Sequence, residues 1–148
     1  MAVRIVSRQP LTKGWSTDQK YKVELEDGRF GLLRIAERSA IEVKKVEFQL
    51  VENLFGLGLP VAEPLSCWAD DLSVYTLYEW VEGQDMNEVA SDLQDSVLYE
   101  LGCQAGKFLR ALHGLPIDQS LRDWNSFYKA KIDSKLAAYQ AASHSYPN

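Results

Sequence analysis

Residues 20–57 read KYKVELEDGRFGLLRIAERSAIEVKKVEFQLVENLFGL, and they contain two strand-like segments followed by one helical segment. Residues 20–25 alternate polar and apolar side chains, which indicates a strand with one buried face. The dipeptide Asp27-Gly28 predicts a tight hairpin turn, because such a turn needs residues that tolerate positive φ. A second strand is predicted over residues 30–35. We therefore expect an antiparallel hairpin that leads into a helix.

The helical segment is predicted to begin near Ser39, whose side chain can cap it, and to run to about Leu57. Gly58 and Pro60 follow, and both residue types end helices. One apolar stripe at helical spacing consists of Val43, Val46, Leu50, Leu54 and Leu57. If this stripe faces the core, Leu50→Ala should cost about 2 to 5 kcal/mol of stability.

The flanking segments complete the prediction of a mixed fold. Strands are expected over residues 5–12, 65–68 and 74–80, and helices over residues 95–113 and 123–142. The predicted class is α+β, with a mainly antiparallel sheet of about five strands, one helix packed on it, and further helices after it.

Composition excludes several functions. The chain has 148 residues, 46% hydrophobic content and a net charge of -5, which predicts a globular domain without a nucleic-acid or anionic-membrane surface. Cys67 and Cys103 have no cysteine or histidine at metal-ligand spacing beside them, so neither a zinc site nor a disulfide framework is predicted. The sequence shows no signal-like or membrane-spanning apolar run, and a cytoplasmic location is expected.

Glu47 is the most informative single residue, because it falls on the apolar stripe of the predicted helix. A carboxylate on that face needs a partner. Arg34, the single charge in the apolar run 32–35, is the nearest upstream candidate. Kinases use a strand cation to grip nucleotide phosphates and a helix glutamate to hold that cation. The alternatives are a purely structural ion pair, or two residues at the rim of the fold.

Two further segments could contact a nucleotide. The turn at residues 14–18 offers backbone donors and the hydroxyls of Ser16 and Thr17 to a phosphate, although it lacks a Walker motif. The strand end at residues 78–83 offers backbone groups to an adenine edge. Each segment also has a simpler interpretation, an ordinary hairpin loop for the first and a crossover between domains for the second.

Taken in their order along the chain, these segments resemble the amino-terminal portion of the aminoglycoside phosphotransferase family, which is related to choline kinase and more distantly to protein kinases. The resembling segments are LTKGWSTDQKY (11–21), GLLRI (31–35), VEF (46–48), LPV (59–61), YTLYEWVEG (75–83) and LGCQAGKFLRALH (101–113). Each segment is weak alone. Together they span nearly the whole chain, so the set is specific.

The resemblance implies a kinase-like N-lobe over residues 1–82 and the start of a helical C-lobe over 83–148. It implies that ATP is the cofactor, with magnesium expected only where the metal ligands of the C-lobe are present. The implied nucleotide-binding residues are Gly14, Trp15, Ser16, Thr17 and Asp18 over the phosphates, Arg34 as the phosphate-gripping cation, Glu47 to orient it, and Glu79, Trp80 and Val81 along the adenine. Asp85 would lie at the mouth of the cleft.

The catalytic part of the family pattern does not appear in these residues. His113-Gly114 is followed by Leu115, so it does not match the family's His-Gly-Asp loop, and no catalytic or metal-binding residue is assigned. We expect the ATP-binding part of a small-molecule kinase, truncated before its catalytic loop, whose substrate is a hydroxyl compound. The alternative is a non-catalytic interaction module that self-associates through exposed apolar surface.

Overall fold

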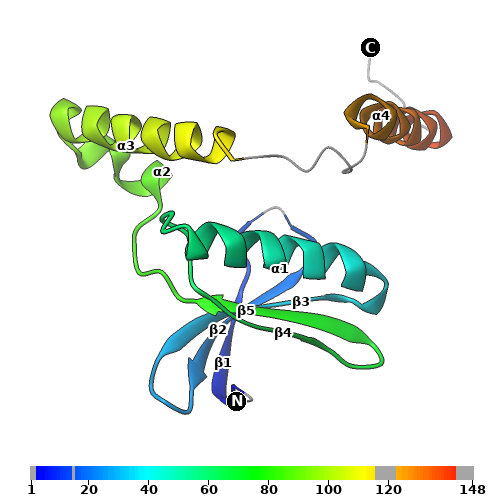
Figure 1. The fold of residues 1–148 in the computed structure, drawn as a ribbon, viewed down its shortest axis with the longest axis horizontal. Coiled ribbons are helices and arrows are strands. Elements are labelled where there is room, and N and C mark those ends of the chain that lie inside the picture. The colour runs from blue at the N-terminus through cyan, green and yellow to red at the C-terminus, as the bar shows by residue number, and fades with distance from the viewer. Residues whose placement is uncertain (1–2, 15, 116–122, 143–148) are drawn as a thin grey trace. The chain divides into compact units, whose positions relative to one another are not determined.

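The computed structural model describes residues 3–14, 16–115 and 123–142 (Figure 1). Its elements are β1 (Ile5–Leu11), β2 (Gln19–Leu25), β3 (Phe30–Glu37), η1 (Arg38–Ala40), α1 (Ile41–Gly56), β4 (Pro64–Ala69), β5 (Ser73–Glu79), α2 (Met86–Val89), η2 (Ala90–Asp92), α3 (Asp95–His113) and α4 (Trp124–Ala141). The strands form a five-stranded sheet in the order β1-β2-β3-β5-β4, with every neighbouring pair antiparallel. The predicted α+β class is confirmed.

The hairpin between β2 and β3 forms where the Asp27-Gly28 dipeptide predicted it. Gly28 has a φ of 82°, which a residue with a side chain rarely adopts, and its N–H donates to the Leu25 carbonyl at 2.9 Å. The resulting register places Lys20 opposite Arg34. The turn therefore sets which side chain of β2 lies beside the cation of β3.

The sheet separates an apolar face from a more polar one. Leu33 and Leu77 are paired across β3 and β5, and with Val23 and Leu25 they form the buried core. Because side chains alternate along a strand, Arg34 lies on the opposite face. That opposite face meets α1, where the rings of Phe48 and Tyr78 are 5.5 Å apart. Arg34 is thereby placed on the same face as the helix.

The stripe of α1 that packs on the sheet is not the stripe that the sequence suggested. The buried side chains of α1 are Phe48 and Leu54, and Ile41, Lys44 and Val51 are half-buried on the same side. The expected stripe is wrong except for Leu54. Its other members are exposed, and we name them the outer stripe of α1: Val43, Val46 and Leu50 of the helix, and Leu57, its C-cap residue. Lys44 interrupts the apolar pattern of the packed stripe, which is why periodicity selected its neighbour.

The start of α1 also differs from the prediction. Ser39 belongs to the short helix η1, the N-cap of α1 is Ala40, and no side chain caps it. The Ser39 hydroxyl instead donates to Glu37 at 3.4 Å. At the other end Gly58 has a φ of 74°, as expected for a glycine that ends a helix.

The two long helices after the sheet follow the predicted boundaries, and the short elements α2 and η2 precede them. α3 and α4 agree with the sequence, and Asp123 caps α4 by accepting from the N–H groups of Asn125 and Ser126. The short α2, capped by Asp85, was not predicted. The chain forms two compact units, Met1–Ala111 and Leu112–Asn148, and the expected domain boundary after residue 82 remains a prediction. Among the described residues, none of the helices has both the length and the hydropathy of a bilayer-spanning segment.

Candidate functional site

The loop between β1 and β2 is shaped by Gly14. This residue has a φ of 108°, outside the range that other residues adopt readily. Beside it, the Lys20 ammonium donates to the Lys13 carbonyl at 2.7 Å. Further along, the Asp18 N–H donates to the Ser16 hydroxyl at 3.1 Å. The loop thus folds back on itself next to Arg34, with Asp18 at its end. The predicted Trp15 lies outside the described residues.

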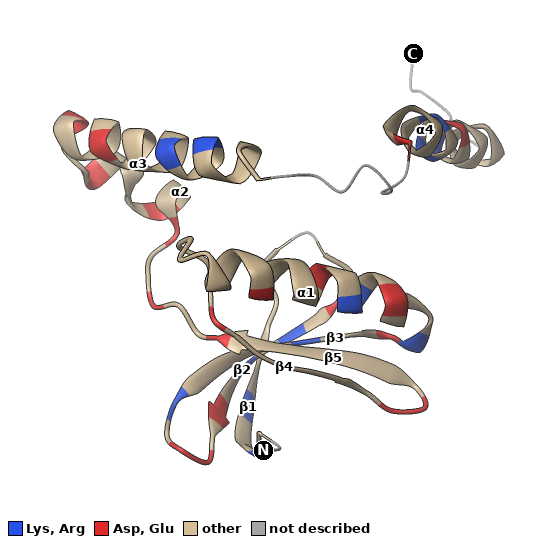
Figure 2. Cartoon of the chain, in the orientation of Figure 1, with Lys and Arg blue, Asp and Glu red and all other residues tan. Residues whose placement is uncertain are grey.

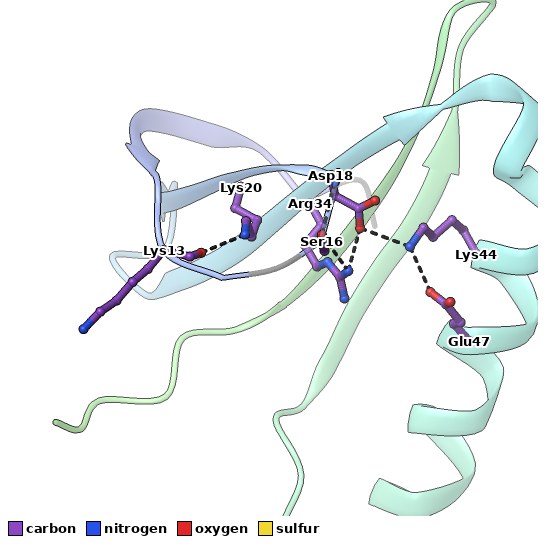
Figure 3. Close-up of polar contacts among 7 residues, drawn as sticks. All are labelled: Lys13, Ser16, Asp18, Lys20, Arg34, Lys44 and Glu47. Atoms are coloured by element: carbon purple, nitrogen blue, oxygen red, sulfur yellow. Dashed lines mark hydrogen bonds and ion pairs between the residues drawn. The ribbon is translucent and has the colours of Figure 1, made fainter. Parts of the chain in front are cut away.

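Asp18 is the centre of the polar cluster in Figure 3. Its Oδ2 atom accepts from Arg34 Nη2 at 2.6 Å and from Lys44 Nζ at 3.0 Å. Lys44 also contacts Glu47 Oε2 at 3.0 Å, and Arg34 Nη2 lies 3.4 Å from the Ser16 hydroxyl. Charges of both signs therefore alternate from β3 through the loop to α1: Arg34, Asp18, Lys44 and Glu47.

The direct Arg34–Glu47 ion pair suggested by the sequence is corrected by this arrangement. Asp18 and Lys44 stand between the two residues (Figure 3). The Glu47 side chain is 51% exposed, whereas that of Asp18 is only 7% exposed. The buried carboxylate of the site is thus on the loop and not on the helix. Glu47 reaches the strand cation only through two other side chains.

The two cations hold the Asp18 carboxylate in its charged form. Burial by itself would raise the pKa of Asp18, but the hydrogen bond from Lys44 and the charge of Arg34 outweigh it, so the pKa lies below its usual value. Burial would likewise lower the pKa of Lys44, but its hydrogen bonds to Glu47 and Asp18 raise that pKa above its usual value. Both groups are charged at neutral pH.

Lys44 is the residue that the sequence reasoning missed. Its side chain is 13% exposed. It is one of several charged residues along α1, which carries both signs (Figure 2), so its charge alone does not distinguish it. The signal that could have found it is its spacing, three residues after Ile41 and four before Phe48, on the stripe that packs against the sheet. A lysine on a packed stripe needs an acceptor, and Asp18 is that acceptor.

Two buried side-chain nitrogens among the described residues have no hydrogen-bond partner, and each belongs to a predicted site residue. They are Arg34 Nε and Trp80 Nε1. A buried donor without a partner is costly, and native structures contain few of them. Functional sites are one place where they persist, because a ligand can supply the missing acceptor.

The connector after β5 is already engaged in backbone bonds. The Glu79 N–H donates to the Glu63 carbonyl at 2.8 Å and the Trp80 N–H to the Phe30 carbonyl at 3.0 Å. Lys22 lies over the Trp80 ring, with its ammonium 4.5 Å from the ring centroid, and pairs with Glu82 at 3.1 Å. Two of the N–H groups that could meet an adenine are therefore used within the fold. Val81, which follows, is exposed.

Asp85 joins the segment after β5, called here the connector, to the loop between β1 and β2 that contains Gly14, called here the glycine loop. It lies 3.0 Å from Lys13 Nζ, which also contacts Glu88 of α2. The bond from the Asn87 N–H, and then the bond from Lys13, lower the pKa of Asp85. The loop that contains Gly14 is thus connected at its base to the first helix after the sheet.

A cavity of about 510 Å³ adjoins the cluster. Its lining includes Thr17, Asp18 and Lys44, together with Ser39 and Val43 near the start of α1. No group of three or more His, Cys, Asp or Glu side chains in the described residues could hold a metal ion. The cationic groups of the site are Arg34 and Lys44, and no metal ligands are assigned to it.

Comparison with known proteins supports a family assignment. A family model described as the phosphotransferase enzyme family matches residues 7–147. The matched range includes the glycine loop, Arg34, all of α1 and the connector after β5. A search of curated proteins found no match.

Proposed function

The chain belongs to the phosphotransferase enzyme family, as its resemblance to the aminoglycoside phosphotransferases predicted, and we propose that it is the ATP-binding part of a small-molecule kinase. The full reaction would transfer the γ-phosphoryl group of ATP to a hydroxyl of a small molecule. The observation that carries the proposal is the environment of Arg34. Its guanidinium lies beside the loop of Gly14, and its buried Nε atom has no partner.

The proposed arrangement puts the nucleotide phosphates at the cluster and the adenine at the connector. Gly14, Ser16 and Thr17 of the loop cover the phosphates, with Trp15 between them in the sequence. Arg34 binds them as a planar donor, a geometry that matches phosphate oxygens well. Glu79, Trp80 and Val81 lie along the adenine. Glu47 supports this site through Lys44, in place of the direct contact with Arg34 that the family pattern implies.

Binding of a fluorescent ATP analogue tests the proposal. Arg34→Ala should weaken the affinity by about tenfold or more, because it removes a charge-assisted hydrogen bond to phosphate. Displacement by unlabelled ATP identifies the signal as specific. The matched control is Arg4→Ala, which removes an exposed arginine that pairs with Glu26, and its affinity should equal that of the wild type. Equal affinities of the wild type and a folded Arg34→Ala protein would remove Arg34 from this role.

A second candidate function is a non-catalytic interaction module. The observation that favours it is the outer stripe of α1, whose four valine and leucine side chains are exposed. Contiguous apolar surface of this kind often marks a contact with another protein. This candidate predicts self-association without any response to ATP, so the binding experiment above separates the two functions.

A further inference from the structure

We propose that Asp18 occupies a two-cation phosphate site when no nucleotide is bound, and that Lys44 is the second phosphate-binding residue of that site. In this proposal an incoming phosphate displaces the Asp18 carboxylate from Arg34 and Lys44. The inference rests on the proposed function, since it assigns a further residue and an internal competitor to the same nucleotide site.

The first step is the convergence of two cations on one oxygen. Arg34 comes from β3 and Lys44 from α1, and both donate to the same Oδ2 atom of Asp18, at 2.6 and 3.0 Å. A phosphate group carries at least as much negative charge as a carboxylate, and it has more acceptor oxygens. It can therefore replace Asp18 between the same two donors. Figure 3 shows the carboxylate placed between the guanidinium and the ammonium.

The second step concerns the guanidinium of Arg34, which has one bonded and one unbonded nitrogen on the edge that faces Asp18. Its Nη2 atom donates to Asp18, whereas its Nε atom is buried without a partner. These two nitrogens lie on one edge of the planar group and can bind an oxyanion together. Asp18 uses only one of them. A phosphate on this edge would accept from both, so the exchange of Asp18 for phosphate satisfies a donor that the ligand-free protein leaves unpaired.

The third step is the support of Lys44. Glu47, on the same helix, accepts from Lys44 Nζ through its Oε2 atom at 3.0 Å. The loss of Asp18 would therefore not leave Lys44 without an acceptor. A cavity of about 510 Å³, lined by Asp18 and Lys44, adjoins the pair. Lys44 thus keeps an acceptor when the loop residue leaves, and the cavity beside Asp18 and Lys44 has space for the displaced side chain.

The test measures binding of inorganic triphosphate, without metal, to the full chain by calorimetry. Asp18→Asn should strengthen triphosphate binding about tenfold, because it removes the competing charge, and Lys44→Met should weaken it about tenfold. Lys44→Arg should retain most of the affinity. Two control variants make the same changes in charge at exposed residues of α1, Glu42→Gln for Asp18→Asn and Lys45→Met for Lys44→Met. Both controls should bind triphosphate with the affinity of the wild type. Circular dichroism establishes that each variant is folded.

Two results would overturn the inference. One is a folded Asp18→Asn protein that binds triphosphate no better than Glu42→Gln, since Asp18 would then be a structural partner and not a competitor. The other is equal affinity of Lys44→Met and Lys45→Met. Either result, together with a weakened Arg34→Ala protein, would leave the proposed function intact. An Arg34→Ala protein that binds the ATP analogue normally would instead remove Arg34 from the nucleotide site, and with it the main support for the proposed function.

Discussion

Asp18 connects three parts of the fold that are separate in the sequence. It ends the loop after β1, and its carboxylate joins β3 to α1 through Arg34 and Lys44. The sequence placed it in the phosphate loop but predicted no partner for it. Its burial and its two cations make it the residue on which the geometry of the site depends most directly.

The lowered pKa of Asp18 predicts how stability depends on pH. A carboxyl whose folded pKa is below its unfolded value of 3.8 stabilises the fold above that value, and the contribution disappears as pH falls through the folded pKa. At pH 7 we expect Asp18→Asn to be less stable than the wild type by on the order of 1–2 kcal/mol.

Urea unfolding of both proteins at pH 7 and near pH 3 measures this difference. The difference in unfolding free energy should be smaller at the lower pH, because the unfolded Asp18 carboxyl takes up a proton there more readily than the folded one, whose pKa is lowered. The charged groups that contact Asp18 are Arg34 and Lys44, and both are present in each protein. The pKa of Lys44 is raised, so Lys44 keeps its charge at both pH values. A gap that is the same at both pH values would contradict the assignment of the shift to Asp18.

At the scale of the element, α1 carries two candidate apolar stripes. The structure buries the one through Phe48 and Leu54, and it leaves the outer stripe exposed. Leu54 belongs to both stripes, so the prediction that it is buried was correct although the rest of the predicted stripe is exposed. The choice between the stripes also decides the site, since the packed stripe is the one that brings Lys44 to Asp18.

A pair of substitutions on α1 checks which stripe is packed. Leu54→Ala should lower the free energy of unfolding by about 2–5 kcal/mol, because its side chain is 7% exposed and its removal leaves a cavity. Leu50→Ala should cost less than about 1 kcal/mol, because Leu50 is 53% exposed, and this replaces the larger loss expected from the sequence. Chemical denaturation of the two variants gives both values. Similar losses would mean that the outer stripe is covered.

Across the whole molecule, burial is concentrated in the sheet. Val23, Leu33 and Leu77 are almost completely buried, whereas α3 and α4 contain no buried residue among the described ones. Stability should be distributed in the same way, since segments with few buried contacts open more readily than a packed core. Of these two helices α3 is the more amphipathic in sequence, and neither buries a side chain among its described residues.

Hydrogen exchange measured by mass spectrometry tests this distribution. Amides of β3 and β5 should exchange slowest, and amides of α4 should exchange much faster. Repeating the measurement at protein concentrations about a hundredfold apart serves as the control, because self-association would protect the outer stripe of α1 only in the concentrated sample. Protection of α4 equal to that of β5 would contradict the expected distribution. Protection of α1 that rises with concentration would favour the interaction module.

The sequence by itself determined the strands, their hairpin and the long helices. Period-two and helical apolar patterns and the Asp27-Gly28 turn are local signals, and each acts within a few residues. The family resemblance, confirmed by the match over residues 7–147, came from the order of those segments. Arg34 was recognised because a single charge within an apolar strand is visible without knowledge of its partner.

Only the tertiary structure decided the order of β3, β5 and β4, the packed stripe of α1, and the partner of Arg34. Each of these depends on contacts between residues far apart in the chain. Lys44 and Glu47 lie three residues apart on one helix, and a rotation of that helix decides which of them approaches the sheet. Packing against the sheet turned Lys44 toward Asp18 and left Glu47 half exposed, and no local pattern contains that choice.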